Sequence, residues 1–163
     1  MRTINLHFVI FFALTVLVST LFGSTPMAAE KSPSQVTDEL RTMVLNLKPD
    51  DIGLTSENFT HPVYAIVMET GFPEGAITLS AVADGSTSLY FSGGGGIIGG
   101  GEHENVRLAS GYFLTEAQNY YKSAELVSRF PKPETGNVIF YFITFSGVRS
   151  YTALENDLEH FLI

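Results

Sequence analysis

The stretch "VYAIVMETGFPEGAITLSAVADGSTSLYFS", residues 63–92, predicts three β-strands joined by tight turns. Residues 63–70 and 76–83 are rich in β-branched and apolar side chains, and the sequence Gly-Phe-Pro-Glu-Gly between them is typical of a turn. The sequence Asp-Gly-Ser then separates the second run from residues 87–92. Because Asp-Gly between apolar runs favours a hairpin, we expect an antiparallel three-stranded meander.

A helix is expected before this meander, over residues 32–49. Ser32 and Gln35 have the spacing of a capping box, and Pro33 stands at the first helical position. Apolar residues then recur at helical spacing and are expected to face the core. They are Val36, Leu40, Met43 and Leu47.

A long helix is expected after the meander, from about residue 102, because apolar residues recur there every three or four positions. This stripe consists of Val106, Ala109, Phe113, Ala117, Tyr120, Ala124 and Val127. The sequence "FPKPETG" ends the helix, and residues 137–145 and 148–151 are expected to form a second hairpin. Thr152 and Glu155 have capping-box spacing for a short last helix, whose core-facing residues would include Leu154, Leu158 and Phe161.

This order of elements predicts an α+β fold in a single domain, residues 30–163. It comprises an antiparallel sheet of about five strands with three helices on its faces. The order is similar in outline to that of roadblock-like and profilin-like folds. That resemblance implies a role in binding or scaffolding.

The first 29 residues have the pattern of a secretory signal peptide. Arg2 is their only charged residue, an apolar stretch follows over residues 8–22, and small residues lead to a cleavage site after Ala29. We therefore expect an exported protein, either periplasmic or secreted. The alternative is an uncleaved membrane anchor formed by residues 4–22, a length close to the roughly 20 residues that cross a bilayer.

The charge of the mature chain argues against several partners. Cleavage after Ala29 leaves eight basic and 17 acidic side chains, a net charge of −9. Nucleic acid is not expected to bind, because its affinity for proteins depends on Lys and Arg. No basic cluster suits anionic lipid, so no membrane contact is expected after cleavage. Cysteine is absent, which excludes disulfides and a lipobox-type lipid anchor.

Residues 93–101 form a glycine-rich loop in which seven of the nine residues are glycine. Gly94, Gly96 and Gly99 fit the spacing G-x-G-x-x-G of nucleotide-binding loops. However, Glu102 and Glu104 are expected in the next helical turn and would repel a phosphate. At about 6 Å and an effective dielectric constant near 20, each charge pair costs roughly 2.8 kcal/mol. No nucleotide or other cofactor is therefore predicted.

The two isoleucines of this loop admit two interpretations. Burial of Ile97 and Ile98 would pin the loop, each contributing about 1.5–3 kcal/mol. Alternatively, exposed isoleucines would contact a partner or a membrane. Together with Gly94, Gly96 and Gly99 they are the candidate binding residues.

Catalytic and metal-binding patterns are sparse. Ser92, paired with His103, is the one nucleophile in a suggestive place, because no G-x-S-x-G motif and no cysteine are present. The histidines lack the close spacing of zinc sites. Three acidic residues at turns, Glu69, Glu74 and Asp84, are expected to be solvated. The sequon at Asn58 applies only in a eukaryotic source.

The sequence thus favours a small exported, non-catalytic domain that binds a protein partner or a small ligand. One alternative is a hydrolase or ligand-binding enzyme that uses Ser92 and His103. A second is a membrane-tethered assembly subunit.

Overall fold

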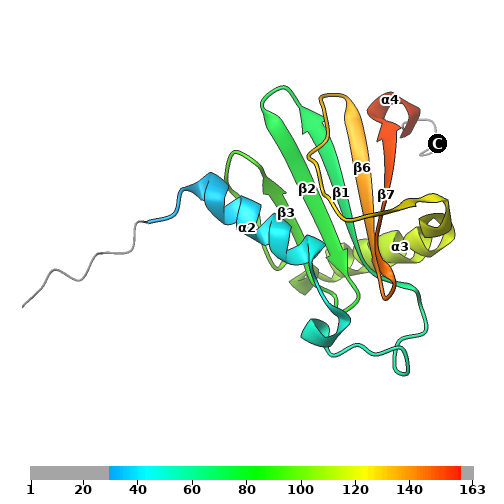
Figure 1. The fold of residues 1–163 in the computed structure, drawn as a ribbon. Coiled ribbons are helices and arrows are strands. Elements are labelled where there is room, and N and C mark those ends of the chain that lie inside the picture. Colours follow the sequence, from blue (N-terminus) through cyan, green and yellow to red (C-terminus); the bar gives the residue numbers. More distant parts are fainter. Residues whose placement is uncertain (1–29, 159–163) are drawn as a thin grey trace, which may run out of the picture. The chain divides into compact units, whose positions relative to one another are not determined.

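The described part of the chain forms a seven-stranded antiparallel sheet with a helix on each face (Figure 1). The computed structural model describes residues 30–158. The strands follow the order β4-β3-β2-β1-β6-β7-β5, which places β1 at the centre and β4 and β5 at the edges. They are β1 (Val63–Phe72), β2 (Gly75–Val82), β3 (Thr87–Phe91), β4 (Gly96–Ile97), β5 (Glu125–Val127), β6 (Asn137–Thr144) and β7 (Gly147–Leu154).

The α-helices and 3-10 helices complete the domain. They are α2 (Pro33–Leu45), η1 (Pro49–Ile52), η2 (Gly100–Glu102), α3 (Glu104–Tyr120), η3 (Tyr121–Ser123) and α4 (Glu155–Leu158). The predicted α+β class is confirmed. The sheet has seven strands where about five were expected, because the glycine-rich loop and the segment after α3 each add a short edge strand.

The meander predicted for residues 63–92 is confirmed. β1 and β2 pair as far as Phe72 and Gly75, so two residues form the turn between them. In the next turn the carboxylate of Asp84 accepts a hydrogen bond from the N–H of Ser86 at 2.8 Å. Gly85 has a φ of +90°, which glycine adopts more readily than any other residue.

The second predicted hairpin is also confirmed, and it completes the centre of the sheet. β6 and β7 pair up to Thr144 and Gly147. β6 also pairs with β1, which therefore has a hydrogen-bonded neighbour on both sides. Every residue from Val63 to Val67 is buried, as expected for a strand covered on both faces.

Each face of the sheet has its own hydrophobic core. Tyr64 and Tyr141 belong to the core that packs against Leu45 of α2 and the segment after it. Ile66 and Phe142 belong to the core that packs against Ala117 of α3. Figure 1 shows α2 in front of the sheet and α3 behind it.

The helix α2 begins as predicted. The Ser32 hydroxyl accepts a hydrogen bond from the N–H of Gln35 at 3.3 Å, and the Gln35 side chain accepts one from the N–H of Ser32 at 2.8 Å. This is the expected capping box, with Pro33 at the first position.

The face that α2 turns toward the sheet differs from the prediction. Thr37 and Leu45 are buried, whereas Val36 and Met43 are 42% and 65% exposed. The predicted stripe is wrong at Val36 and Met43, because a polar residue, Thr37, occupies the inner face, and a pattern of apolar residues does not detect it. Leu47 packs against the core as predicted.

The long helix α3 is shorter than predicted. It begins at Glu104, with Glu102 in the preceding η2, and it ends at Tyr120. The predicted continuation to Val127 is wrong, because residues 125–127 form β5 and pair with β7. Without β5 the backbone groups along the outer side of β7 would lack partners.

The core-facing residues of α3 also differ in part from the predicted stripe. Ala117 is buried as expected, but Ala109 and Tyr120 are exposed. Ser110 is buried instead, where its hydroxyl accepts a hydrogen bond from Thr87 at 2.8 Å.

The prediction that buried isoleucines pin the glycine-rich loop is wrong. Ile97 and Ile98 are 63% and 67% exposed. Backbone packing holds the loop instead, since Gly101 lies directly against the turn between β2 and β3, and Gly94 lies against Pro33. Neither position has room for a side chain, so glycine itself supplies the close contacts.

The cap predicted for the last helix is wrong. β7 continues through Leu154, and Thr152 pairs with Ile139 in the sheet. α4 begins at Glu155, whose N–H donates a hydrogen bond to the carbonyl oxygen of Gly136 at 3.0 Å.

The predicted signal peptide and Phe161 lie outside the described residues. Among the helices of residues 30–158, none combines the length and the apolar character that a membrane crossing requires.

Candidate binding groove

A groove of about 360 Å³ lies between the first turns of α2 and the glycine-rich loop. Pro33, Val36 and Leu40 line it from α2, and Gly96 and Ile98 line it from the loop. The volume lies at the lower end of the roughly 300–1,000 Å³ typical of ligand pockets. The groove therefore fits one or two apolar side chains or a small ligand.

The groove brings together only part of the predicted binding set. Gly96 and Ile98 line it, whereas Ile97 and Gly99 do not. Gly94 lies at its edge and brings the loop against α2. Its φ is +112°, and a Cβ at this position would lie 2.5 Å from the Cβ of Pro33.

Two residues with hydroxyl groups also line the groove. Tyr90 of β3 is 4% exposed. Burial raises the pKa of Tyr90 from its ordinary value of 10 to about 12. Thr37 of α2 donates its hydroxyl hydrogen to the carbonyl oxygen of Ser34 at 3.0 Å.

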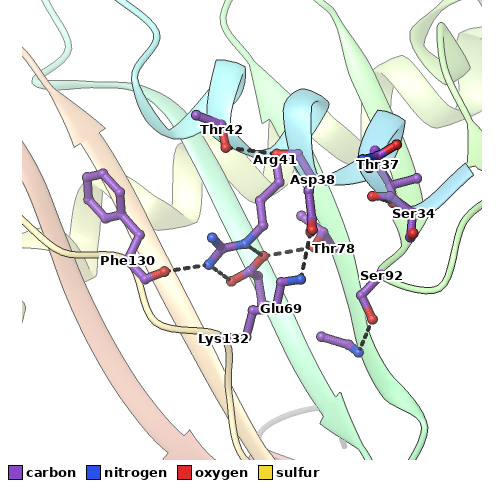
Figure 2. Close-up of polar contacts among 12 residues, drawn as sticks. Ser34, Thr37, Asp38, Arg41, Thr42, Glu69, Thr78, Ser92, Phe130 and Lys132 are labelled. Atoms are coloured by element: carbon purple, nitrogen blue, oxygen red, sulfur yellow. Dashed lines mark hydrogen bonds and ion pairs between the residues drawn. The ribbon is translucent and has the colours of Figure 1, made fainter. Parts of the chain in front are cut away.

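A buried ion pair holds α2 against the sheet beside this groove (Figure 2). Arg41 of α2 donates to both carboxylate oxygens of Glu69 in β1, from Nε at 2.6 Å and from Nη2 at 2.7 Å. The Glu69 side chain is fully buried, and its Oε1 also accepts a hydrogen bond from Thr78 at 2.8 Å. Such a bidentate pair fixes geometry as well as charge.

The electrostatics of Arg41 follow from this pair. Burial by itself would lower the pKa of Arg41, but the hydrogen bonds and the negative charge of Glu69 outweigh it and raise the pKa above its ordinary value. The guanidinium is therefore permanently charged.

The same guanidinium also binds the crossover segment between β5 and β6. Arg41 Nη2 donates to the carbonyl oxygens of Phe130 at 3.0 Å and Pro131 at 3.3 Å. Tyr141 of β6 donates to the same Pro131 carbonyl at 2.6 Å. Burial raises the pKa of Tyr141 to about 12. The side chain of Arg41 thus connects the helix α2, the central strand β1 and the crossover segment between β5 and β6.

The prediction that Glu69 is solvated is wrong, and the role of Arg41 was missed. One signal was available: Glu69 lies two residues after Val67, so strand alternation places both on the same face of the sheet. A carboxylate on that buried face needs a cation, and Arg41 lies on the inner side of the preceding helix.

Ser92 and His103 occupy separate places. The Ser92 hydroxyl accepts a hydrogen bond from the N–H of Ala76 at 2.8 Å, which fixes the end of β3 to β2 (Figure 2). Ser92 borders a second hollow of about 300 Å³ with Phe72 and Glu74. His103 is exposed at the start of α3, lines neither hollow and makes no capping hydrogen bond through its side chain. Within residues 30–158, no hydrogen bond joins the two side chains.

The segment before α3 uses several of its own amides. The N–H groups of Glu102 and His103 donate to the carbonyl oxygens of Gly99 and Gly100 at 3.1 Å. The N–H of Val106 donates to the Asn105 side chain at 3.0 Å. These contacts, together with Glu104 in the first turn, make this helix start a poor site for anions.

Residues 30–158 contain no cluster of three or more His, Asp or Glu side chains that could hold a metal ion.

No protein-family model matches the chain, and searches of curated proteins and of solved structures found no match either. The resemblance in element order to roadblock-like and profilin-like folds stays a prediction.

Proposed function

We propose that the protein is a small exported, non-catalytic domain that binds a protein partner or a small ligand in the groove between α2 and the glycine-rich loop. The observation that carries this proposal is the exposure of apolar side chains around a hollow. Ile98 is 67% exposed and Val36 is 42% exposed, and both line the groove. Exposed apolar residues gathered in one place are typical of interaction sites.

The rigidity of the groove supports the same function. The Arg41–Glu69 pair and the contact between Gly94 and Pro33 fix the two walls. A site that is formed before its ligand arrives loses less conformational entropy on binding. The acidic character of the chain further favours a protein or a small molecule over nucleic acid.

The proposal is tested by a pull-down from the exported fraction. It compares single variants in their ability to retain the protein partner or small ligand that the wild type retains. Ile98→Asp and Val36→Asp place a charge in the groove and should abolish retention. Met43→Asp is the control, because Met43 lies on the same helix, is 65% exposed and does not line the groove. Urea unfolding should give similar midpoints for all three variants.

If the wild type retains material and both groove variants retain it equally well, the proposal is refuted. If Ser92→Ala removes a hydrolytic activity and the groove variants keep that activity, the hydrolase interpretation is favoured instead. Export itself is tested by the mass of the secreted protein, which should begin at Glu30.

A further inference from the structure

We propose that the ligand of the groove is an extended peptide that adds to the sheet alongside β4, with one apolar side chain in the groove and a basic side chain facing Glu102. This inference rests on the proposed function, because it specifies what the same groove binds.

The first argument is the open edge of β4. In its register, Tyr90 lies opposite Gly96 and Leu89 opposite Ile97, and the N–H of Phe91 donates to the carbonyl oxygen of Gly95 at 3.0 Å. In an antiparallel pair the hydrogen-bonded and non-bonded positions alternate, so Gly96 occupies a non-bonded position. Its N–H and C=O therefore point away from β3. Among the strands of residues 30–158, β4 is the last on this side, so these groups face an open edge there.

An extended peptide would satisfy these two groups. Main-chain hydrogen bonds to an exposed sheet edge contribute affinity that does not depend on the sequence of the peptide. Pockets for every second side chain supply the specificity. A Cβ at Gly96 would collide with Leu89 and Tyr90 of β3, so glycine is what allows this residue to lie against β3 with its outer side free of any side chain.

The second argument is the position of the groove next to this edge. Gly96 and Ile98 form one wall of it, and Val36 and Leu40 of α2 form the other. A strand laid against Gly96 therefore places every second side chain over the space between β4 and α2. The apolar walls select leucine, isoleucine, valine or phenylalanine there.

The third argument is charge. The Glu102 carboxylate lies beside the loop, 3.8 Å from where a Cβ on Gly99 would stand. Glu104 follows in the first turn of α3. Within residues 30–158, neither carboxylate takes part in an ion pair, whereas Lys31 at the groove is neutralised by Glu39 at 2.6 Å. The site thus favours a peptide with lysine or arginine near its apolar residue.

The test uses fluorescent synthetic peptides of alternating valine and threonine around a central leucine, with lysine near one end. Both placements of the lysine are measured, because the direction of the added strand is open. Fluorescence anisotropy on the full protein should show saturable binding of at least one of the two. Replacing lysine by glutamate should weaken that binding by at least about tenfold, since like charges would then meet. N-methylation of the peptide backbone around the leucine should abolish it.

The protein variants locate the site. Ile98→Asp should weaken binding by at least about tenfold, the size of effect expected at the centre of an interface. Met43→Asp should leave it unchanged. Glu102→Gln should remove most of the preference for lysine over glutamate, whereas Glu116→Gln, on the exposed side of α3, should not. Amide hydrogen exchange at Gly96 should slow when the peptide is bound.

Failure of this inference and failure of the proposed function give different results. If N-methylated and unmodified peptides bind equally well, or if neither of the two peptides binds, the inference that a peptide adds to the sheet as a strand is wrong. If Ile98→Asp still abolishes retention of material from the exported fraction, the groove stands as a site for a small ligand or a folded partner. If dimers form through the groove and Ile98→Asp dissociates them, the occupant is a second copy of this chain and the inference is wrong.

Discussion

Removing the guanidinium of Arg41 should destabilise the protein far more than removing an exposed cation that also pairs with α2, Lys132 of the crossover segment. In Arg41→Ala the Glu69 carboxylate remains fully buried with only the Thr78 hydroxyl as a side-chain partner. Two charges about 4 Å apart at an effective dielectric constant near 20 attract by roughly 4 kcal/mol. Breaking a buried pair by removing one partner costs about 3–5 kcal/mol. We expect a loss of that size in the free energy of unfolding.

The measurement is urea unfolding followed by circular dichroism, with the slope of the transition compared between variants. Lys132→Ala is the matched control. Lys132 also joins the crossover segment to α2, through Asp38 at 2.6 Å, but these two side chains are 43% and 55% exposed. An exposed pair contributes about 0–1 kcal/mol.

A double variant separates the pair from its surroundings. Arg41→Met combined with Glu69→Leu removes both charges and should be much less destabilised than Arg41→Ala alone, because no lone charge stays buried. A loss below about 1 kcal/mol in Arg41→Ala, equal to that of Lys132→Ala, would refute the conclusion that this pair holds α2 in place.

Three further predictions follow from the burial and packing of single residues. Because burial raises the pKa of Tyr90 from 10 to about 12, the folded state keeps a proton that the unfolded state loses. The free energy of unfolding should therefore fall by about 2–3 kcal/mol for this residue between pH 10 and 12, and a pH series of urea unfolding should show a shallower fall in Tyr90→Phe. Gly94→Ala should cost about 1–3 kcal/mol in the same assay, because of its φ of +112° and the contact with Pro33, whereas Gly93→Ala, with open space around it, should be nearly neutral. Ser92→Ala leaves the N–H of Ala76 without its acceptor and should lower thermal stability by about 1–3 kcal/mol, and an unchanged melting temperature would contradict this role.

The sequence predicted the elements whose signals are local. Alternating apolar runs and the Asp-Gly turn identified the meander, and the Ser32–Gln35 pair identified the start of α2. These patterns depend on neighbouring residues alone, so no knowledge of the fold was needed.

The elements that depend on distant partners were not predicted. β5 forms because β7 offers an open edge, although residues 124–127 continue the helical pattern. Ile97 and Ile98 are exposed because backbone contacts of the neighbouring glycines hold the loop at the sheet edge. The outcome at each of these places depends on which segments meet in space.

The candidate site was predicted in part for the same reason. The glycine-rich loop was identified, with Gly96 and Ile98 among its binding candidates. The opposite wall, from Pro33 to Leu40, came from a helix whose predicted core-facing stripe included Val36. The ion pair of Arg41 with Glu69 of β1 fixes which side of that helix faces the sheet, and Val36 then lines the groove.

The contacts of Arg41 also determine the order in which the chain can fold. Its partners Phe130 and Pro131 lie 89 and 90 residues further along the sequence, and β1 likewise obtains its second neighbour only from β6. Structures dominated by such remote pairings form slowly. Until residue 144 has left the ribosome, the amino-terminal half lacks the strand that closes its sheet. The sheet therefore cannot close, and its two hydrophobic cores cannot be completed, before most of the chain has been synthesised.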